Sequence, residues 1–234
     1  MSKNANKGME VILKRMLTTL DRKVDPSHTA LIVIDVQNEF LEGGVFDKEG
    51  KNISLMQAMV PRLVSFIGEA RKAGVTIIYT RSIWGSEDSR YLSDVCVEQQ
   101  TRDSKGRFIE YPVCREGTWG ADFYEGIKPL PGEVVVTKHR FSCFTDTNLD
   151  LILRSRGVRT LVMTGITANV CVETSARDGF CRDYYIVLLR DCTAAPSEEL
   201  YKNTLVNIDR HFGQVVDVSD VLKCWQKSSP LKDT

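Results

Sequence analysis

Short runs of β-branched and other apolar residues recur along this chain, each followed by a segment of helical character. The first run, residues 30–35 (ALIVID), is almost unbroken. Such runs are typical of strands that are buried on both faces, as in a parallel sheet. The pattern therefore predicts an α/β fold.

Strand and helix alternate six times. We expect strands at residues 30–35, 75–80, 133–137, 160–164, 185–189 and 214–218. The helix after the first strand should have Pro61 near its first turn and Gly74 at its stop, and Ser197 should cap a later helix. This order predicts a three-layer α/β/α, doubly wound domain with a six-stranded parallel sheet. We assign residues 27–234 to one domain and residues 1–26 to an N-terminal extension.

The charge balance and the cysteines limit the class of protein. Lys plus Arg and Asp plus Glu both total 31, so no general attraction to nucleic acid or to an anionic membrane is expected. No apolar run approaches the roughly 18 residues of a membrane span, and the N-terminal residues lack the apolar core of a secretory signal. Seven cysteines without a CxxC motif indicate neither a disulfide framework nor a zinc ribbon. We expect a cytoplasmic protein with reduced thiols.

Three reactive side chains follow predicted strands. Ligands bind at the carboxyl ends of the strands of such a sheet, and Asp35, Lys138 and Cys171 all lie there. Each also has an ordinary alternative: Asp35 could form a turn, Lys138 could be a solvated loop residue, and Cys171 could be a small residue of the core. Together, an acid, an amine and a thiol at one edge favour a reactive centre.

The segment 164–174 (TGITANVCVET) supports a nucleophile. A strand ends at a glycine, and the chain then delivers Cys171 to the predicted start of a helix, where free N–H groups favour a thiolate. Backbone N–H groups there can stabilise an oxyanion. Asp35 is the candidate base, and Lys138 would offset the negative charges. His139 is the one histidine near this site, and a direct role for it stays open.

Three motifs carry a resemblance to a known family: residues 30–40 (ALIVIDVQNEF), 135–144 (VVTKHRFSCF) and 165–174 (GITANVCVET). They are similar to the opening strand, the lysine segment and the nucleophile loop of the isochorismatase-like cysteine hydrolases. The resemblance implies strand order 3-2-1-4-5-6, a catalytic set of Asp35, Lys138 and Cys171, no cofactor, and a homodimer or homotetramer.

The resemblance also implies finer features of the site. The peptide bond between Ile166 and Thr167 should be cis, and the N–H groups of Thr167 and Cys171 should form the oxyanion hole. Six side chains are expected to line the substrate pocket: Gln37, Asn38, Phe40, Trp84, Trp119 and Phe141. For Trp84 and Trp119, packing on their own loops is an equally open reading.

Two departures narrow the expected reaction. Nicotinamidases of this group carry a histidine-rich metal motif after the second strand, but residues 79–88 contain no histidine, so no metal site is expected. Isochorismatases that cleave a vinyl ether lack the cysteine, so Cys171 favours an amide substrate. Residues 117–120, 153–157 and 177–180 look like those of ureidoacrylate amidohydrolases. The expected enzyme is an amidohydrolase (EC 3.5.1-type) that releases ammonia from a ureidoacrylate- or biuret-like ureide through a cysteine acyl intermediate.

Other readings compete with this one. A nucleotide-binding oxidoreductase would need a glycine-rich turn after the first strand, where the chain reads DVQNEF, and no P-loop spacing is present. A nicotinamidase-like or other small-amide hydrolase, and a catalytically inactive binding relative, remain alternatives.

Overall fold

Six parallel strands form the centre of the molecule. The computed structural model describes residues 3–101 and 113–228. The strands are β1 (Thr29–Ile34), β2 (Thr76–Ser82), β3 (Val134–Lys138), β4 (Thr160–Gly165), β5 (Tyr185–Thr193) and β6 (Gln214–Val216). Their order is β3-β2-β1-β4-β5-β6, and every pair is parallel. The predicted fold class and strand order are confirmed.

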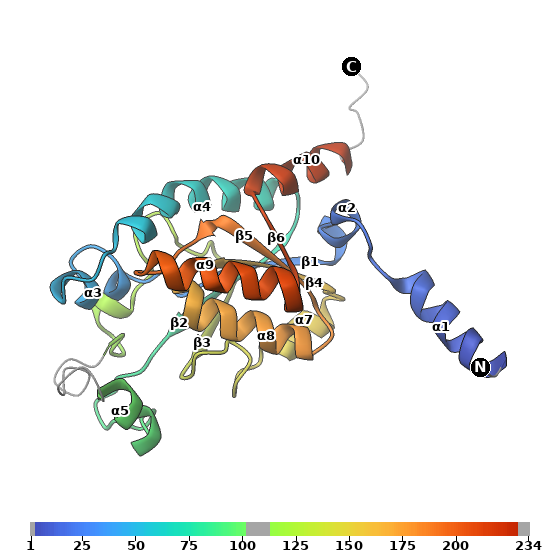
Figure 1. Cartoon of the computed structure of the whole chain (residues 1–234). Helices are drawn as coiled ribbons and strands as arrows, with labels where there is room; N and C mark the ends of the chain where they lie inside the picture. Colours follow the sequence, from blue (N-terminus) through green and yellow to red (C-terminus); the bar gives the residue numbers. More distant parts are fainter. Residues whose placement is uncertain (1–2, 102–112, 229–234) are drawn as a thin grey trace.

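Helices cover both faces of this sheet (Figure 1). The helices are α1 (Lys3–Arg15), α2 (Leu20–Lys23), α3 (Val45–Lys48), α4 (Ser54–Lys72), α5 (Asp94–Thr101), α7 (Leu149–Ser155), α8 (Glu173–Cys181), α9 (Glu198–Asn207) and α10 (Val218–Ser228). Two π-helical turns, Ala168–Val172 and Ile208–Phe212, precede α8 and follow α9. Among the described residues, no helix is long and apolar enough to cross a membrane.

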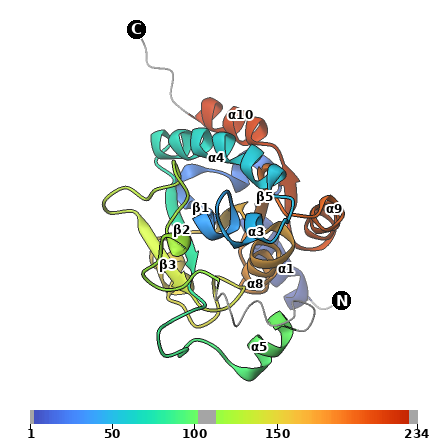
Figure 2. The same ribbon diagram turned by 90° about the vertical axis from the view of Figure 1, so that its left-hand side faces the viewer.

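Successive side chains of β1 point to opposite faces of the sheet, and the core is accordingly divided into two layers. Leu31 and Val33 belong to the cluster that includes Phe66 of α4 and Trp225 of α10. Ile32 and its neighbours on the other face pack with residues of α7 and α8. In Figure 2, α4 and α10 lie together on one side of the sheet, and α8 lies on the other. The unbroken apolar run of β1 follows from this burial on both faces.

The expected position of Pro61 was wrong. The helix begins at Ser54, whose N–H donates to Asn52 Oδ1 at 3.1 Å, so Pro61 is its eighth residue. Pro61 cannot donate to the carbonyl of Gln57, but it lies on the exposed face of α4, where water can bind that carbonyl. The expected cap at Ser197 is confirmed, because its side chain accepts from Leu200 N–H.

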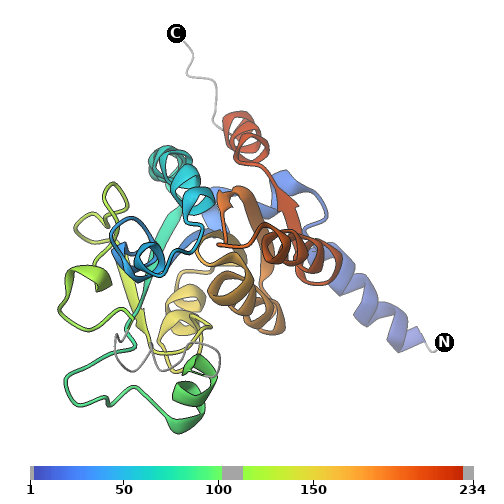
Figure 3. The same ribbon diagram turned by 60° about the vertical axis from the view of Figure 1, so that its left-hand side comes forward.

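The N-terminal helix α1 extends away from the rest of the chain (Figure 3). Met9 and Ile12 of α1 are 55% and 57% exposed, whereas Leu17 and Val24 are buried and Trp225 Nε1 donates to Val24 O at 2.7 Å. We propose that residues 27–234 form one domain and residues 1–26 an extension. In this division, residues 17–26 pack on the domain and α1 projects from it.

Candidate active site

Asp35 stands immediately after β1, between the ends of β2 and β4. Its backbone adopts the left-handed conformation (φ 50°), which Asp tolerates better than most residues. Its side chain is fully buried, and Thr80 Oγ1 donates to Oδ1 at 2.7 Å. The fold therefore holds one carboxylate at the carboxyl edge of the sheet with its second oxygen directed to Lys138.

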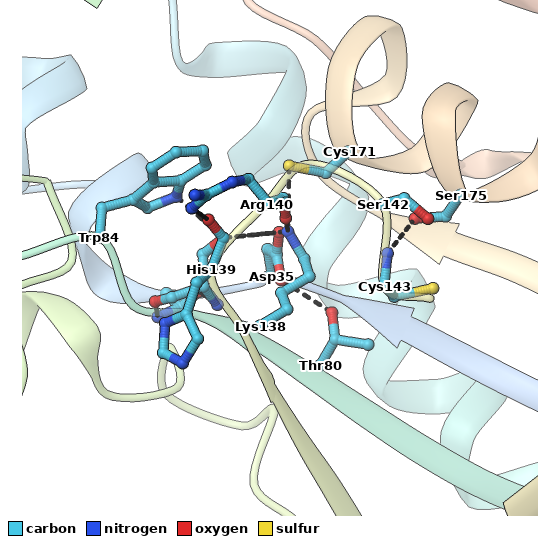
Figure 4. Close-up of polar contacts among 12 residues, drawn as sticks. Asp35, Thr80, Trp84, Lys138, His139, Arg140, Ser142, Cys143, Cys171 and Ser175 are labelled. Carbon is cyan, nitrogen blue, oxygen red and sulfur yellow. Dashed lines mark hydrogen bonds and ion pairs between the residues drawn. The ribbon is translucent and has the colours of Figure 1, made fainter. Parts of the chain in front are cut away.

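Lys138 ends β3 and reaches Asp35 by crossing over the end of β2, which lies between the two strands. Its Nζ lies 2.7 Å from Asp35 Oδ2 and 3.4 Å from Cys171 Sγ, with both lysine and aspartate side chains fully buried. Burial lowers the pKa of Lys138, but the charge of Asp35 and the hydrogen bond to it oppose burial, and the net shift of that pKa is upward. The ammonium thus remains charged between the carboxylate and the sulfur (Figure 4).

The loop after β4 brings Cys171 to this pair. Gly165 has φ 105°, and a Cβ there would lie 2.1 Å from Ile34 O, so only glycine fits against β1. The Ile166–Thr167 peptide bond is cis. Ala168 N–H then donates to Ala194 O at 2.8 Å, which ties the loop to the segment after β5.

The sequence predicted that a helix starts near Cys171, and the structure places this residue in a π-helical turn just before α8. Cys171 is the fourth residue of the π-helical turn Ala168–Val172, and α8 begins two residues later. Only 8% of Cys171 is exposed. Burial raises the pKa of its thiol to about 12, although Lys138 opposes the shift. Desolvation penalises a buried anion, so burial keeps the proton on the resting sulfur. A base must remove its proton during attack.

Two hydroxyls of β2 complete the site, and sequence reasoning missed both. Thr80 binds Asp35 as described above. Ser82 Oγ accepts from Lys138 Nζ at 3.0 Å and from Trp84 Nε1 at 3.1 Å, and it lies 3.4 Å from Asp35 Oδ2. Since the hydroxyl has one proton, the two accepted bonds direct that proton toward Asp35. The available signal was the i, i+2 spacing of the two hydroxyl residues, which places both on one face where β2 ends.

Of the expected pocket residues, Trp84 contacts these groups directly through Ser82, and Phe141 packs against Trp84. Trp84 is buried, binds Ser82 and packs against Phe141, with ring centroids 5.3 Å apart. Phe40 lies in the core and packs edge-on against Phe46. Trp84 and Phe141 thus form an aromatic pair beside Ser82, the hydroxyl that also binds the Lys138 ammonium.

The structure does not support substrate contacts for Gln37. Both N–H groups of its amide donate to backbone carbonyls, of Ser82 at 3.0 Å and Ala121 at 2.8 Å. Its Oε1 accepts from Ser82 N–H at 2.8 Å. Gln37 is fully buried and has no donor left for a ligand, so it fastens the end of β2 to the loop that contains Ala121.

Asn38 and Trp119 lie together at a separate surface depression of about 570 Å³. Asn38 Nδ2 donates to Trp119 O at 2.8 Å, and Trp119 is 55% exposed. Within the described ranges, the residues lining this depression do not include the three reactive side chains. The structure therefore does not place Trp119 at the reacting atoms, and its side chain is largely exposed at this depression.

His139 is directed away from the sulfur (Figure 4). Its ring stacks on Tyr91 with centroids 3.7 Å apart, and Nδ1 lies 2.8 Å from Ile83 O. These contacts give His139 a role in fastening the loop after β2. In the part of the chain that the structure describes, no group of three or more His, Cys, Asp or Glu side chains could hold a metal ion.

Comparison with known proteins agrees with this arrangement of strands and loops. The model of the isochorismatase domain matches residues 29–220. The chain belongs to the isochorismatase family.

Ureidoacrylate amidohydrolase RutB of Agrobacterium fabrum is 33% identical over 220 residues, 89% of this chain and 94% of that protein. RutB of Methylobacterium radiotolerans is 35% identical over 206 residues, 84% of this chain and 79% of that protein. A cysteine hydrolase from Pseudomonas syringae pv. phaseolicola shares 26% identity with a TM-score of 0.71, over 88% of this chain and 96% of that structure. N-carbamoylsarcosine amidase from Thermoplasma acidophilum shares 26% identity with a TM-score of 0.64, over 82% and 96%.

Proposed function

We propose that this chain is a cysteine-dependent amidohydrolase (EC 3.5.1-type) that releases ammonia from a small ureido or carbamoyl compound. The observation that carries the proposal is the contact of Lys138 with both Asp35 and Cys171 in a buried site. The ureidoacrylate amidohydrolases and the N-carbamoylsarcosine amidase among its relatives support a ureide of the ureidoacrylate or biuret type.

The first half-reaction transfers the carbamoyl carbon to sulfur. Asp35 accepts the Sγ proton while the sulfur attacks the carbonyl carbon, because the resting thiol is protonated. The N–H groups of Thr167 and Cys171 would receive the oxyanion. The C–N bond then breaks, Asp35 returns the proton to the leaving nitrogen, and ammonia departs. Lys138 offsets negative charge throughout.

The second half-reaction regenerates the thiol. Water attacks the acyl carbon, Asp35 takes a proton from that water, and the C–S bond breaks with return of the proton to Sγ. The sum is R–NH–CO–NH₂ plus H₂O giving R–NH–COOH plus NH₃, and the carbamic acid decays to amine and CO₂. No step requires a cofactor.

The test is ammonia release from a panel of ureido acids, biuret, simple amides and nicotinamide. We expect turnover of a ureide by the native chain and nearly complete loss in Cys171→Ser. Cys181→Ser, at an exposed thiol on α8, is the matched control and should keep full activity. Substantial activity in Cys171→Ser would reject the nucleophile, and no turnover of any panel member would favour an inactive binding relative.

A reducing compartment and self-association complete the proposal. None of the seven cysteines, all of which lie in the described part of the chain, forms a disulfide, which supports a cytoplasmic location. A homodimer or homotetramer is proposed from the family resemblance, and sedimentation of the purified chain would test it.

A further inference from the structure

Arg140 is a cationic residue beside the reactive centre that the proposed reaction does not use. Its carbonyl accepts a hydrogen bond from Lys138 Nζ at 3.0 Å, so its backbone contacts the ammonium that also touches Cys171. In Figure 4 its side chain extends from this point toward Trp84, on the same side of the ammonium as the sulfur. The guanidinium therefore stands at the periphery of the reactive centre.

The charge of Arg140 has no counter-ion within residues 3–101 and 113–228. Its Nη1 donates to two neutral acceptors, Tyr91 O at 3.0 Å and His139 O at 2.6 Å. By contrast, Arg71 is paired with Glu133 and Arg182 with Asp178. The side chain is only partly exposed, so water solvates it incompletely. A half-buried guanidinium with donors to spare is suited to a carboxylate, which it can bind in bidentate geometry.

The neighbouring groups favour an anion at Arg140 rather than at Lys138. Asp35 already neutralises Lys138 at 2.7 Å. The rings of Trp84 and Phe141 lie beside this region and could cover the apolar carbons of a linear molecule. The two carbonyl bonds of Nη1 also fix the guanidinium before a ligand arrives, which reduces the entropy lost on binding.

We infer that Arg140 binds the carboxylate of an anionic ureide whose carbamoyl group lies at Cys171. This inference rests on the proposed function and makes it more specific: the preferred substrate is a ureido acid, and a neutral ureide such as biuret is a poorer one. Arg140 contacts the substrate away from the reacting bond. Its loss should therefore act mainly on KM.

The experiment compares Arg140→Gln and Arg140→Lys on two substrates of matched length, 3-ureidopropionate and its neutral methyl ester. A charge-assisted hydrogen bond contributes about 1.5–3 kcal/mol, so Arg140→Gln should raise KM for the acid about 10- to 100-fold. KM for the ester should change less than about 3-fold, and Arg140→Lys should recover part of the loss for the acid. Arg90→Gln, an exposed charge change on the preceding loop, is the control.

The outcomes separate the two proposals. Equal losses on acid and ester would show that Arg140 only supports the loop, and unchanged KM for the acid would show that it does not meet the carboxylate; either overturns the inference and leaves the amidohydrolase proposal standing. If the native chain cleaves neither ureide nor any other panel member, the proposed function fails, and the inference fails with it.

Discussion

The buried ion pair between Lys138 and Asp35 leads to a quantitative prediction. Lys138→Met keeps most of the side-chain length but leaves the Asp35 carboxylate in the interior without its cation. Breaking a buried pair from one side typically costs about 3–5 kcal/mol. Thr80 still donates to Asp35 at 2.7 Å, and Ser82 remains within 3.4 Å. We therefore expect a loss near the lower limit, about 3 kcal/mol of the free energy of unfolding.

A double variant separates lost charge compensation from lost packing. Asp35→Asn combined with Lys138→Met removes both charges, so most of the stability should return, with a coupling of about 2 kcal/mol in the double-mutant cycle. Urea unfolding followed by tryptophan fluorescence measures this without relying on activity, because Trp84 and Trp225 are buried reporters. A single variant within about 1 kcal/mol of the native chain, or strictly additive effects, would refute the reasoning.

Three further predictions concern the surrounding structure. Gly165→Ala should abolish turnover and destabilise the fold by about 3 kcal/mol or more, since the new Cβ would lie 2.1 Å from Ile34 O. The control is Gly68→Ala in α4, where a Cβ has open space, and this variant should be neutral or stabilising by about 0.5–1 kcal/mol. Thermal melting of the two variants measures the difference. Ser82→Ala should lower kcat about 10-fold or more with little change in KM, because Lys138 loses an acceptor; steady-state kinetics that show only a KM effect would contradict this. Alkaline pH should destabilise the chain, because burial raises the pKa of the Cys143 thiol to about 12 and the folded state then retains a proton that the unfolded state loses above about pH 9. This contribution to the free energy of unfolding is present below pH 9 and falls by up to about 1.4 kcal/mol per pH unit above it. Urea titrations at pH 8 to 10 measure how steeply the free energy of unfolding falls with pH, and this fall should be less steep in Cys143→Ala.

The strands were the most predictable part of the fold. A run such as residues 30–35 is apolar at every position only when both faces are covered, and this signal does not depend on distant contacts. Element boundaries were less predictable. Pro61 suggested a helix start, but the exposed face of α4 tolerates it. The helix α5 has almost no apolar periodicity, so it was not expected in the long connection after β2.

The reactive groups of the candidate site were predictable, but the residues and the burial that hold those groups in place were not. Asp35, Lys138 and Cys171 follow strands, and the edge rule together with the motif resemblance selected them. The need for a base at the thiol was predicted, but the rise of the Cys171 pKa was not, because it depends on burial that only the folded chain creates. Ser82 was missed because the predicted strand ended at residue 80, so its place in β2 beside Lys138 was not recognised.

The path of the Lys138 side chain across β2 limits which side chains can occupy this edge of the sheet. Adjacent strands lie about 4.8 Å apart, so the Lys138 and Asp35 side chains, with the ion pair between them, together bridge two such spacings across the end of the intervening strand. A leucine or phenylalanine at position 80 or 82 would occupy that passage and separate the ammonium from Asp35. Diversification toward new substrates must therefore proceed through the connecting segments beyond β2, while the two small hydroxyl residues beneath the lysine stay as they are.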